Sequence, residues 1–251
     1  MGAHAPMPNT QNFITNIRRV ATQMAEVNRA YEGLFTQLHH ALTEAIQTES
    51  TPPAQAKVTI KITEEVSQIA AEAFPNPQII ACKKGCDACC HLPVTTEPQT
   101  AFMIAEHLHQ THTPQEVMLL TAELKKRVDA SKPLSFEARQ LTRERCIFLN
   151  PEGACTIYEV RPLVCRSFTS PDAEHCKKVA FDNPNGVHKI QLHPIHYRFF
   201  QGAVTALFAH AKAKGKQADQ ISLNDGLYTA LTTRSAVIKW SNGESIFPKQ
   251  V

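Results

Sequence analysis

The residues of this chain that could do chemistry together are its eight cysteines, which all lie between Cys82 and Cys176. None lies in the 81 residues before this stretch or in the 75 after it. Cysteines that serve only as small core residues have no reason to be confined in this way. Thiolates that share a metal ion do, because coordination needs several soft donors around one point. The sequence therefore predicts a thiolate metal site, and its candidate ligands are Cys82, Cys86, Cys89, Cys90, Cys146, Cys155, Cys165 and Cys176.

The first four cysteines include the spacing of a metal-binding knuckle. In Cys86-x-x-Cys89 the two intervening residues let the chain turn so that both sulfurs face one ion at about 2.3 Å. Gly85 permits a tight backbone just before this turn. Because Cys89 and Cys90 are adjacent, we expect their side chains to diverge. One of them would serve this site, and the other would serve a second ion, bridge two ions or take no part.

The last four cysteines are spaced more loosely, at intervals of 9, 10 and 11 positions. Such intervals are typical of loops that must close on the first group. A four-cysteine zinc site uses two knuckles, and the sequence has one clear knuckle. An iron–sulfur cluster tolerates looser spacing. Spacing alone therefore leaves zinc, iron and an iron–sulfur cluster open.

Basic and imidazole groups accompany the cysteines. Arg161 and Arg166 lie beside cysteines in a compact motif, where cations would lower thiol pKa values and offset the charge of a thiolate-rich site. The neighbouring lysines are equally well explained as solvated side chains: Lys83, Lys84, Lys177 and Lys178. His91 is an alternative ligand next to the cysteine pair, and His188-x4-His193-x2-His196 is an alternative separate site. An ordinary histidine without a metal is the simpler interpretation of each.

Composition and charge limit the cellular environment and the kinds of partner that we expect for this protein. The net charge is +3 and no basic stripe with interleaved aromatics stands out, so we expect no nucleic-acid partner. No run of about 18 apolar residues occurs, so we expect no membrane span. The first residues lack the features of a secretory signal, which favours a cytoplasmic location where thiols stay reduced. Four disulfides are the alternative, disfavoured by the adjacent Cys89 and Cys90.

Apolar periodicity predicts helices on both sides of the cysteine stretch. Apolar residues at steps of 4 and 3 predict a long helix that ends near Thr48: Phe13, Ile17, Val20, Met24, Val27, Tyr31, Leu34 and Leu38. A second apolar series from Val58 to Ala73 follows the break at Pro52 and Pro53, so the two helices form an antiparallel hairpin. We expect this hairpin to pack on the metal-binding part. The alternative is a coiled-coil dimer or an arm that docks a protein partner.

Helix-start signals continue along the chain. Thr96-Glu97-Pro98-Gln99 and Thr113-Pro114-Gln115-Glu116 both have the pattern of a capping box with proline in the first turn. Two further helices are expected from about Pro194 and from Ser222 to Asn242. Residues 146–194 show little apolar periodicity, so we expect metal ligation to order them. The only strand candidate is 146–149.

The cysteine motifs resemble a known family. Cys82…Cys86-x-x-Cys89-Cys90, then Cys146-x-Phe-Leu, then Gly-x-Cys155-x-Ile-Tyr-Glu-x-Arg161-Pro162-x-x-Cys165-Arg166-x-Phe168, resemble the CxxCxxCC family of zinc- or iron-chelating domains over about residues 80–180. The arrangement is also similar to part of the flagellin lysine N-methylases. The resemblance implies that the seven cysteines from Cys82 to Cys165 are metal positions, with Cys176 a weaker match. Cys82 and Cys86 are separated by three residues where the family name has two, and nothing outside the motifs supports methylase activity.

Together these observations predict a mainly α protein, a helical bundle that clamps a cysteine-rich, loop-rich metal-binding core. The expected parts are a disordered N-terminus (1–11), a helical hairpin (12–77), the cysteine-rich domain (78–194) and C-terminal helices packed on it (195–251). We expect a metal-binding protein that holds zinc or iron, with an iron–sulfur cluster as one form. The alternatives are an enzyme of the lysine N-methyltransferase type and a metal-stapled interaction module that binds a partner through the 12–48 helix.

Overall fold

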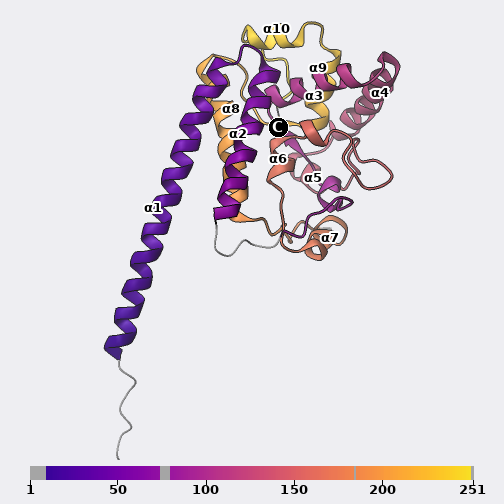
Figure 1. Cartoon of the computed structure of the whole chain (residues 1–251). Helices are drawn as coiled ribbons and strands as arrows, with labels where there is room; N and C mark the ends of the chain where they lie inside the picture. The colour runs from indigo at the N-terminus through magenta and orange to yellow at the C-terminus, as the bar shows by residue number, and fades with distance from the viewer. Residues whose placement is uncertain (1–9, 74–79, 184, 250–251) are drawn as a thin grey trace, which may run out of the picture.

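The computed structural model describes residues 10–73, 80–183 and 185–249, and these are mainly α-helical, as predicted (Figure 1). Their ten α-helices are α1 (Thr10–Thr48), α2 (Pro52–Ala73), α3 (Pro98–Thr111), α4 (Pro114–Ser131), α5 (Phe136–Gln140), α6 (Leu163–Ser167), α7 (Ala173–Phe181), α8 (Pro194–Ala213), α9 (Leu223–Thr232) and α10 (Ala236–Ser241). Two short 3-10 helices, η1 (Ala88–His91) and η2 (Tyr158–Val160), lie within the cysteine-rich stretch. No helix in the described ranges has both the length and the apolar character needed to cross a membrane.

The C-terminal part of α1 and the whole of α2 form a helical hairpin whose inner face packs on the rest of the chain. Leu38, Leu42 and Ile46 of α1 are buried against α8 and α2, and α2 also packs on α3. The same hydrophobic core continues through Phe148 and Leu163 of the cysteine-rich stretch. One continuous core therefore holds the cysteine-rich stretch between the hairpin and the later helices.

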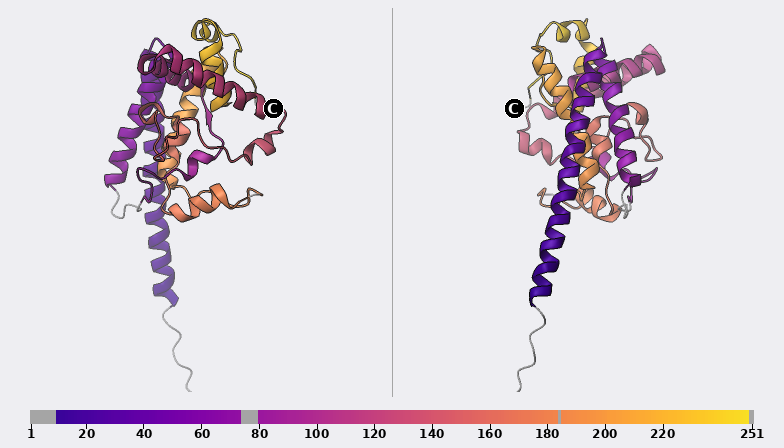
Figure 2. Two further views of the ribbon diagram at one scale, coloured as in Figure 1. Left: turned by 90° about the vertical axis from the view of Figure 1, so that its right-hand side faces the viewer. Right: turned by 60° about the vertical axis from the view of Figure 1, so that its left-hand side comes forward.

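The N-terminal half of α1 projects well beyond the other helices in every view (Figures 1 and 2). The described side chains from 15 to 30 are all exposed. The predicted disorder of 1–11 falls mostly on residues 1–9, which lie outside the described residues. Thr10 and Gln11 belong to α1.

The two predicted capping boxes have different outcomes. Thr113 caps α4 as predicted, with its hydroxyl accepting from the Glu116 amide and the Glu116 carboxylate accepting from the Thr113 amide. The box at Thr96 is wrong, because Thr96 belongs to a strand and Glu97 is the N-cap of α3 without a side-chain capping bond. Thr96 therefore pairs with a distant segment of the chain and does not cap α3.

That pairing forms a small antiparallel sheet of β1 (Thr95–Thr96) and β2 (Ile221–Ser222). The strand candidate at 146–149 is not a named strand, although Leu149 forms an isolated bridge with Cys155. The last predicted helix is divided into α9 and α10, because Ser235 adopts a left-handed conformation with φ of 57° between them. A periodic apolar pattern continues across this break, so periodicity alone did not show it.

Candidate metal centre

The eight cysteines come from separate loops and short helices that the fold brings together. Cys89 and Cys90 lie on η1, Cys165 on α6 and Cys176 on α7. The other four are in loops: Cys82, Cys86, Cys146 and Cys155. All eight are free thiols, so the four-disulfide alternative is not what the structure has.

Cys89 is electrostatically linked to most of the other thiols. Burial raises the pKa of five cysteines, and the charge of Cys89 as a thiolate raises each of these pKa values further: Cys86, Cys146, Cys155, Cys165 and Cys176. Mutual repulsion of this kind requires the sulfurs to lie close enough to feel one another's charge. The thiol of Cys89 is therefore near enough to these five cysteines for its charge to act on each of them.

The adjacent thiols of Cys89 and Cys90 do not diverge as predicted. The Cys90 thiol donates a hydrogen bond to Cys89, and this bond, together with the positive charge of Arg161, lowers the pKa of Cys89 to about 7 although burial opposes the shift. The same hydrogen bond raises the pKa of Cys90. The 3-10 turn of η1 brings the two side chains together, so one is poised as a thiolate while the other keeps its proton.

Three cysteines lie in turns that direct a backbone amide at their own sulfur. Although burial raises the pKa of each of these thiols, the amide two residues later donates to the sulfur and lowers it. The pairs are Cys86 with Ala88, Cys146 with Phe148, and Cys155 with Ile157. Amide donors of this kind support thiolate ligands of metals. The sequence showed a single knuckle, at Cys86, because only there does a second cysteine follow at short spacing.

Ser170 connects the two most distant cysteines of the group. Its amide donates to the Cys82 sulfur at 3.4 Å, and its side chain hydrogen-bonds to Cys176. Burial is the main cause that raises the pKa of Cys176, and the Ser170 bond opposes it. Its role was not visible in the sequence because serine is common in loops and Ser170 is 88 positions from Cys82.

Backbone contacts fix the positions of the cysteine-bearing loops relative to one another. The Cys146 amide donates to the Cys90 carbonyl at 2.8 Å, which ties the second cysteine group to η1. Gly85 has φ of 86°, the left-handed conformation that its position before the knuckle requires. Gly153, with φ of 73°, passes so close that a Cβ built on it would lie 3.4 Å from the Gly85 carbonyl oxygen. The two cysteine loops therefore meet through their glycines.

Arg166 anchors the helix that carries Cys165. Its guanidinium is 4% exposed and donates to the carbonyls of Arg161, Tyr158 and Glu159 at 3.0, 3.3 and 2.5 Å. It also forms an ion pair with Glu64 of α2. This clasp joins η2, α6 and the hairpin, so it fixes the orientation of α6 and with it the position of Cys165.

The histidine alternatives are engaged elsewhere. His91 lies 3.6 Å from the Asp87 carboxylate and packs edge-on against Phe181. His196 bonds to the Ser67 hydroxyl at 2.7 Å and to the Arg166 carbonyl at 2.9 Å. His193 accepts from the His196 amide as the N-cap of α8, while the ring of His188 lies by His175. Each of these rings has structural contacts, and among the described residues His188, His193 and His196 are not grouped to hold an ion.

The donor set fits zinc or iron in its chemistry. Free thiols, backbone amides aimed at sulfur and the nearby cation of Arg161 are what thiolate ligands of these metals need. Among the described residues, no three histidine, cysteine, aspartate or glutamate side chains form a group arranged to hold an ion. The structure thus gathers the thiols and leaves their assignment as ligands a prediction.

Glu97, which the sequence placed only within a capping box, is a buried acid. Its side chain is 1% exposed at the start of α3, and burial raises its pKa to about 7. The Thr100 hydroxyl donates to its carboxylate at 2.7 Å. A glutamate in front of Pro98 looks like an exposed residue of a first helical turn, and only the packing of β1 and α3 shows that it is enclosed.

Together, the helical frame and the gathered thiols define a cysteine-rich domain with the chemistry of metal chelation. Residues 81–184 match the model of the CxxCxxCC family, described as "Putative zinc- or iron-chelating domain". This confirms, for those residues, the family that the cysteine motifs resemble. No curated protein and no solved structure matches the chain.

Proposed function

We propose that this protein holds zinc or iron in a thiolate site centred on Cys89. The observation that carries the proposal is the electrostatic link between Cys89 and the thiols of the other loops. A cysteine that is poised as a thiolate near neutral pH, with protonated thiols around it, is prepared to be the first ligand of an incoming ion. Each further thiol would lose its proton as it joins.

The half-buried thiols that feel the charge of Cys89 would be its main partner donors. Cys90, Cys146, Cys155 and Cys165 would join Cys89, and the positive charge of Arg161 would offset part of their charge on metal loading. Cys82, Cys86 and Cys176 would form a second group, in which Cys82 is exposed, Cys176 is buried and Cys86 shares the knuckle with Cys89. Zinc there would close a structural site, and iron or an iron–sulfur cluster would give an electron-transfer or sensing centre. No observation favours the methyltransferase alternative.

The test is metal analysis of the full-length protein purified without oxygen. The wild-type protein is expected to contain stoichiometric zinc or iron, and Cys89→Ser is expected to lose it. His91→Gln is the matched control, since His91 lies on the same 3-10 helix and is expected to keep the metal. Visible absorption distinguishes an iron–sulfur cluster from colourless zinc. Full occupancy in Cys89→Ser would contradict the proposal.

A further inference from the structure

The projecting half of α1 carries an apolar stripe that nothing in the described part of the chain covers. Five of its large side chains are 43–63% exposed: Ile17, Val20, Met24, Val27 and Leu34. They lie on α1, whose N-terminal half stands clear of the body in both views of Figure 2. A contiguous apolar stripe of this kind on a soluble domain marks an interaction surface. It is separate from the cysteine cluster.

The stripe has the period of a coiled coil. With Tyr31 included, its members recur at alternating steps of 3 and 4, the 3.5-residue repeat that keeps a seam facing a partner helix. Ile17 and Met24 occupy the first core position of the heptad, and Val20, Val27 and Leu34 occupy the second. From Ile17 to Leu34 the seam is about 27 Å long at 1.5 Å per residue.

The positions that flank the seam contain no charge. Between Ile17 and Leu34 they hold only alanine and amide side chains, with one more amide just before the seam: Asn16, Ala21, Gln23, Asn28 and Ala30. Coiled coils that select a different partner use charged residues at these positions. Here two identical helices can approach without any like-charge repulsion along the seam. The uncharged flanks therefore favour pairing between identical chains.

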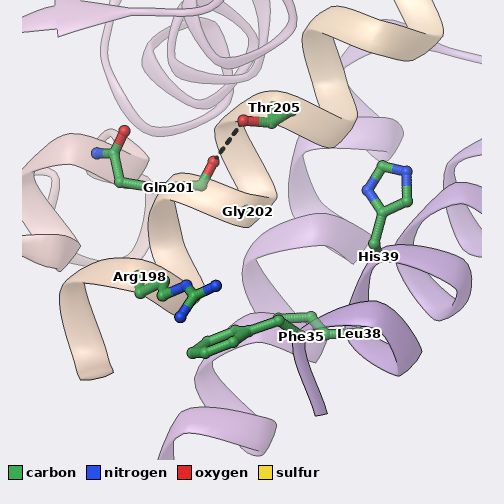
Figure 3. Close-up of a pocket in the computed structure, with 7 residues that line it drawn as sticks. All are labelled: Phe35, Leu38, His39, Arg198, Gln201, Gly202 and Thr205. Carbon is green, nitrogen blue, oxygen red and sulfur yellow. Dashed lines mark hydrogen bonds between the residues drawn. The ribbon is translucent and has the colours of Figure 1, made fainter. Parts of the chain in front are cut away.

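The stripe leads at its C-terminal end into a groove between α1 and α8. Phe35 and Leu38 form one wall, and Gly202 leaves the opposite side open, since a Cβ built there would meet nothing within 4 Å (Figure 3). The volume of the groove is about 200 Å³. Polar side chains also line this groove, and the Arg198 guanidinium lies over the Phe35 ring, 4.0 Å from its centroid. One end of the stripe is thus on a projecting helix, and the other end opens beside the groove.

We propose that two copies of this chain pair through α1 in antiparallel orientation. In this register Ile17 faces Leu34 of the second copy, Val20 faces Tyr31, and Met24 faces Val27. Each of these layers forms twice about a twofold axis near residues 25 and 26. The helical turn before Ile17 then lies beside Phe35 and Leu38 of the other copy. Because the free arm and the groove are on the same chain, the antiparallel pair fills both grooves at once.

The test is the solution mass of the full chain and three variants. At about 50 µM, above the micromolar dissociation constants of modest interfaces, the wild-type protein is expected to have twice the 27.9 kDa chain mass. Met24→Glu is expected to give the monomer, because it places two carboxylates at the twofold axis. Thr22→Glu, on the opposite face of the same turn, is the matched control and should remain dimeric.

A third variant tests the register. In Met24→Glu/Val27→Lys, antiparallel pairing sets each glutamate against a lysine of the other copy, so the dimer should return. Parallel pairing would set like charges together and leave a monomer. Circular dichroism checks that all variants fold, as the 63% exposure of Met24 leads us to expect. A monomeric wild type, including one that carries a different protein on this arm, would overturn the proposal, as would a dimer unaffected by Met24→Glu.

Discussion

Replacing Arg166 with methionine tests whether the buried clasp positions the cysteine-rich stretch. The change keeps an unbranched, largely apolar stem and removes the cation that bonds the carbonyls of Tyr158, Glu159 and Arg161 and the carboxylate of Glu64. The three carbonyls lose a charged donor, which costs more than the loss of a neutral hydrogen bond. Glu64 is half exposed and can regain water. Because each carbonyl that is left buried without a donor costs about 1–3 kcal/mol, we expect a loss of about 3 kcal/mol or more in the free energy of unfolding.

The matched control is Glu64→Gln, which leaves the guanidinium and its three carbonyl bonds in place. Because Glu64 is 48% exposed, its ion pair is screened, and we expect a loss of about 1 kcal/mol or less. Both variants would be unfolded in guanidinium chloride and followed by far-UV circular dichroism, with and without a chelator. A loss below about 1 kcal/mol in Arg166→Met would refute the clasp. Equal losses in both variants would show that the ion pair, and not the carbonyl bonds, carries the effect.

Two further predictions concern pH. Glu97 has a folded pKa of about 7, above its ordinary 4.5, so its contribution to stability is complete below pH 4.5 and is lost as pH rises through 7. Relative to wild type, Glu97→Gln should therefore gain about 3 kcal/mol between pH 4.5 and 8, measured by denaturant unfolding; parallel pH profiles would contradict this. Burial lowers the pKa of His196, so its contribution is present above its ordinary 6.5 and is lost as pH falls through the lower folded value. His196→Gln should weaken this acid sensitivity between pH 7.5 and 5, and an unchanged acid limb would exclude His196 as its source.

The helical frame could be predicted because its signals are local. The apolar stripe from Val20 to Leu38 and the capping box at Thr113 each need only neighbouring residues to act. The family of the cysteine-rich stretch could be predicted as well, because its motifs are short and nearly contiguous, whereas the assignment of individual cysteines as ligands stays a prediction. The break at Ser235 could not, since no glycine or proline marks it and serine rarely adopts a left-handed conformation.

The features that the sequence did not predict depend on contacts between residues far apart in the chain. Thr96 pairs with Ile221, and Arg166 meets Glu64 102 positions away. The amide donors at Cys146 and Cys155 depend on turns whose shape is set by surrounding contacts and not by a spacing rule. The Cys89–Cys90 bond depends on a 3-10 turn, where an extended chain would have separated the side chains.

Buried apolar residues bear on the prediction that metal ligation orders the cysteine-rich stretch. Its apolar residues Phe148, Leu149, Ile157, Val160 and Leu163 follow no helical or strand period, yet all are buried. Apolar periodicity indicates a helix or strand with one buried face. These residues instead enter the core from successive turns. Their spacing along the sequence is therefore irregular, although all of them are buried. With the Arg166 clasp, this core gives the stretch stabilising contacts that do not involve thiols. The Arg166→Met measurement in the presence of chelator tests those contacts directly. Without metal, only the clasp and the core remain to hold Cys165 near Cys89.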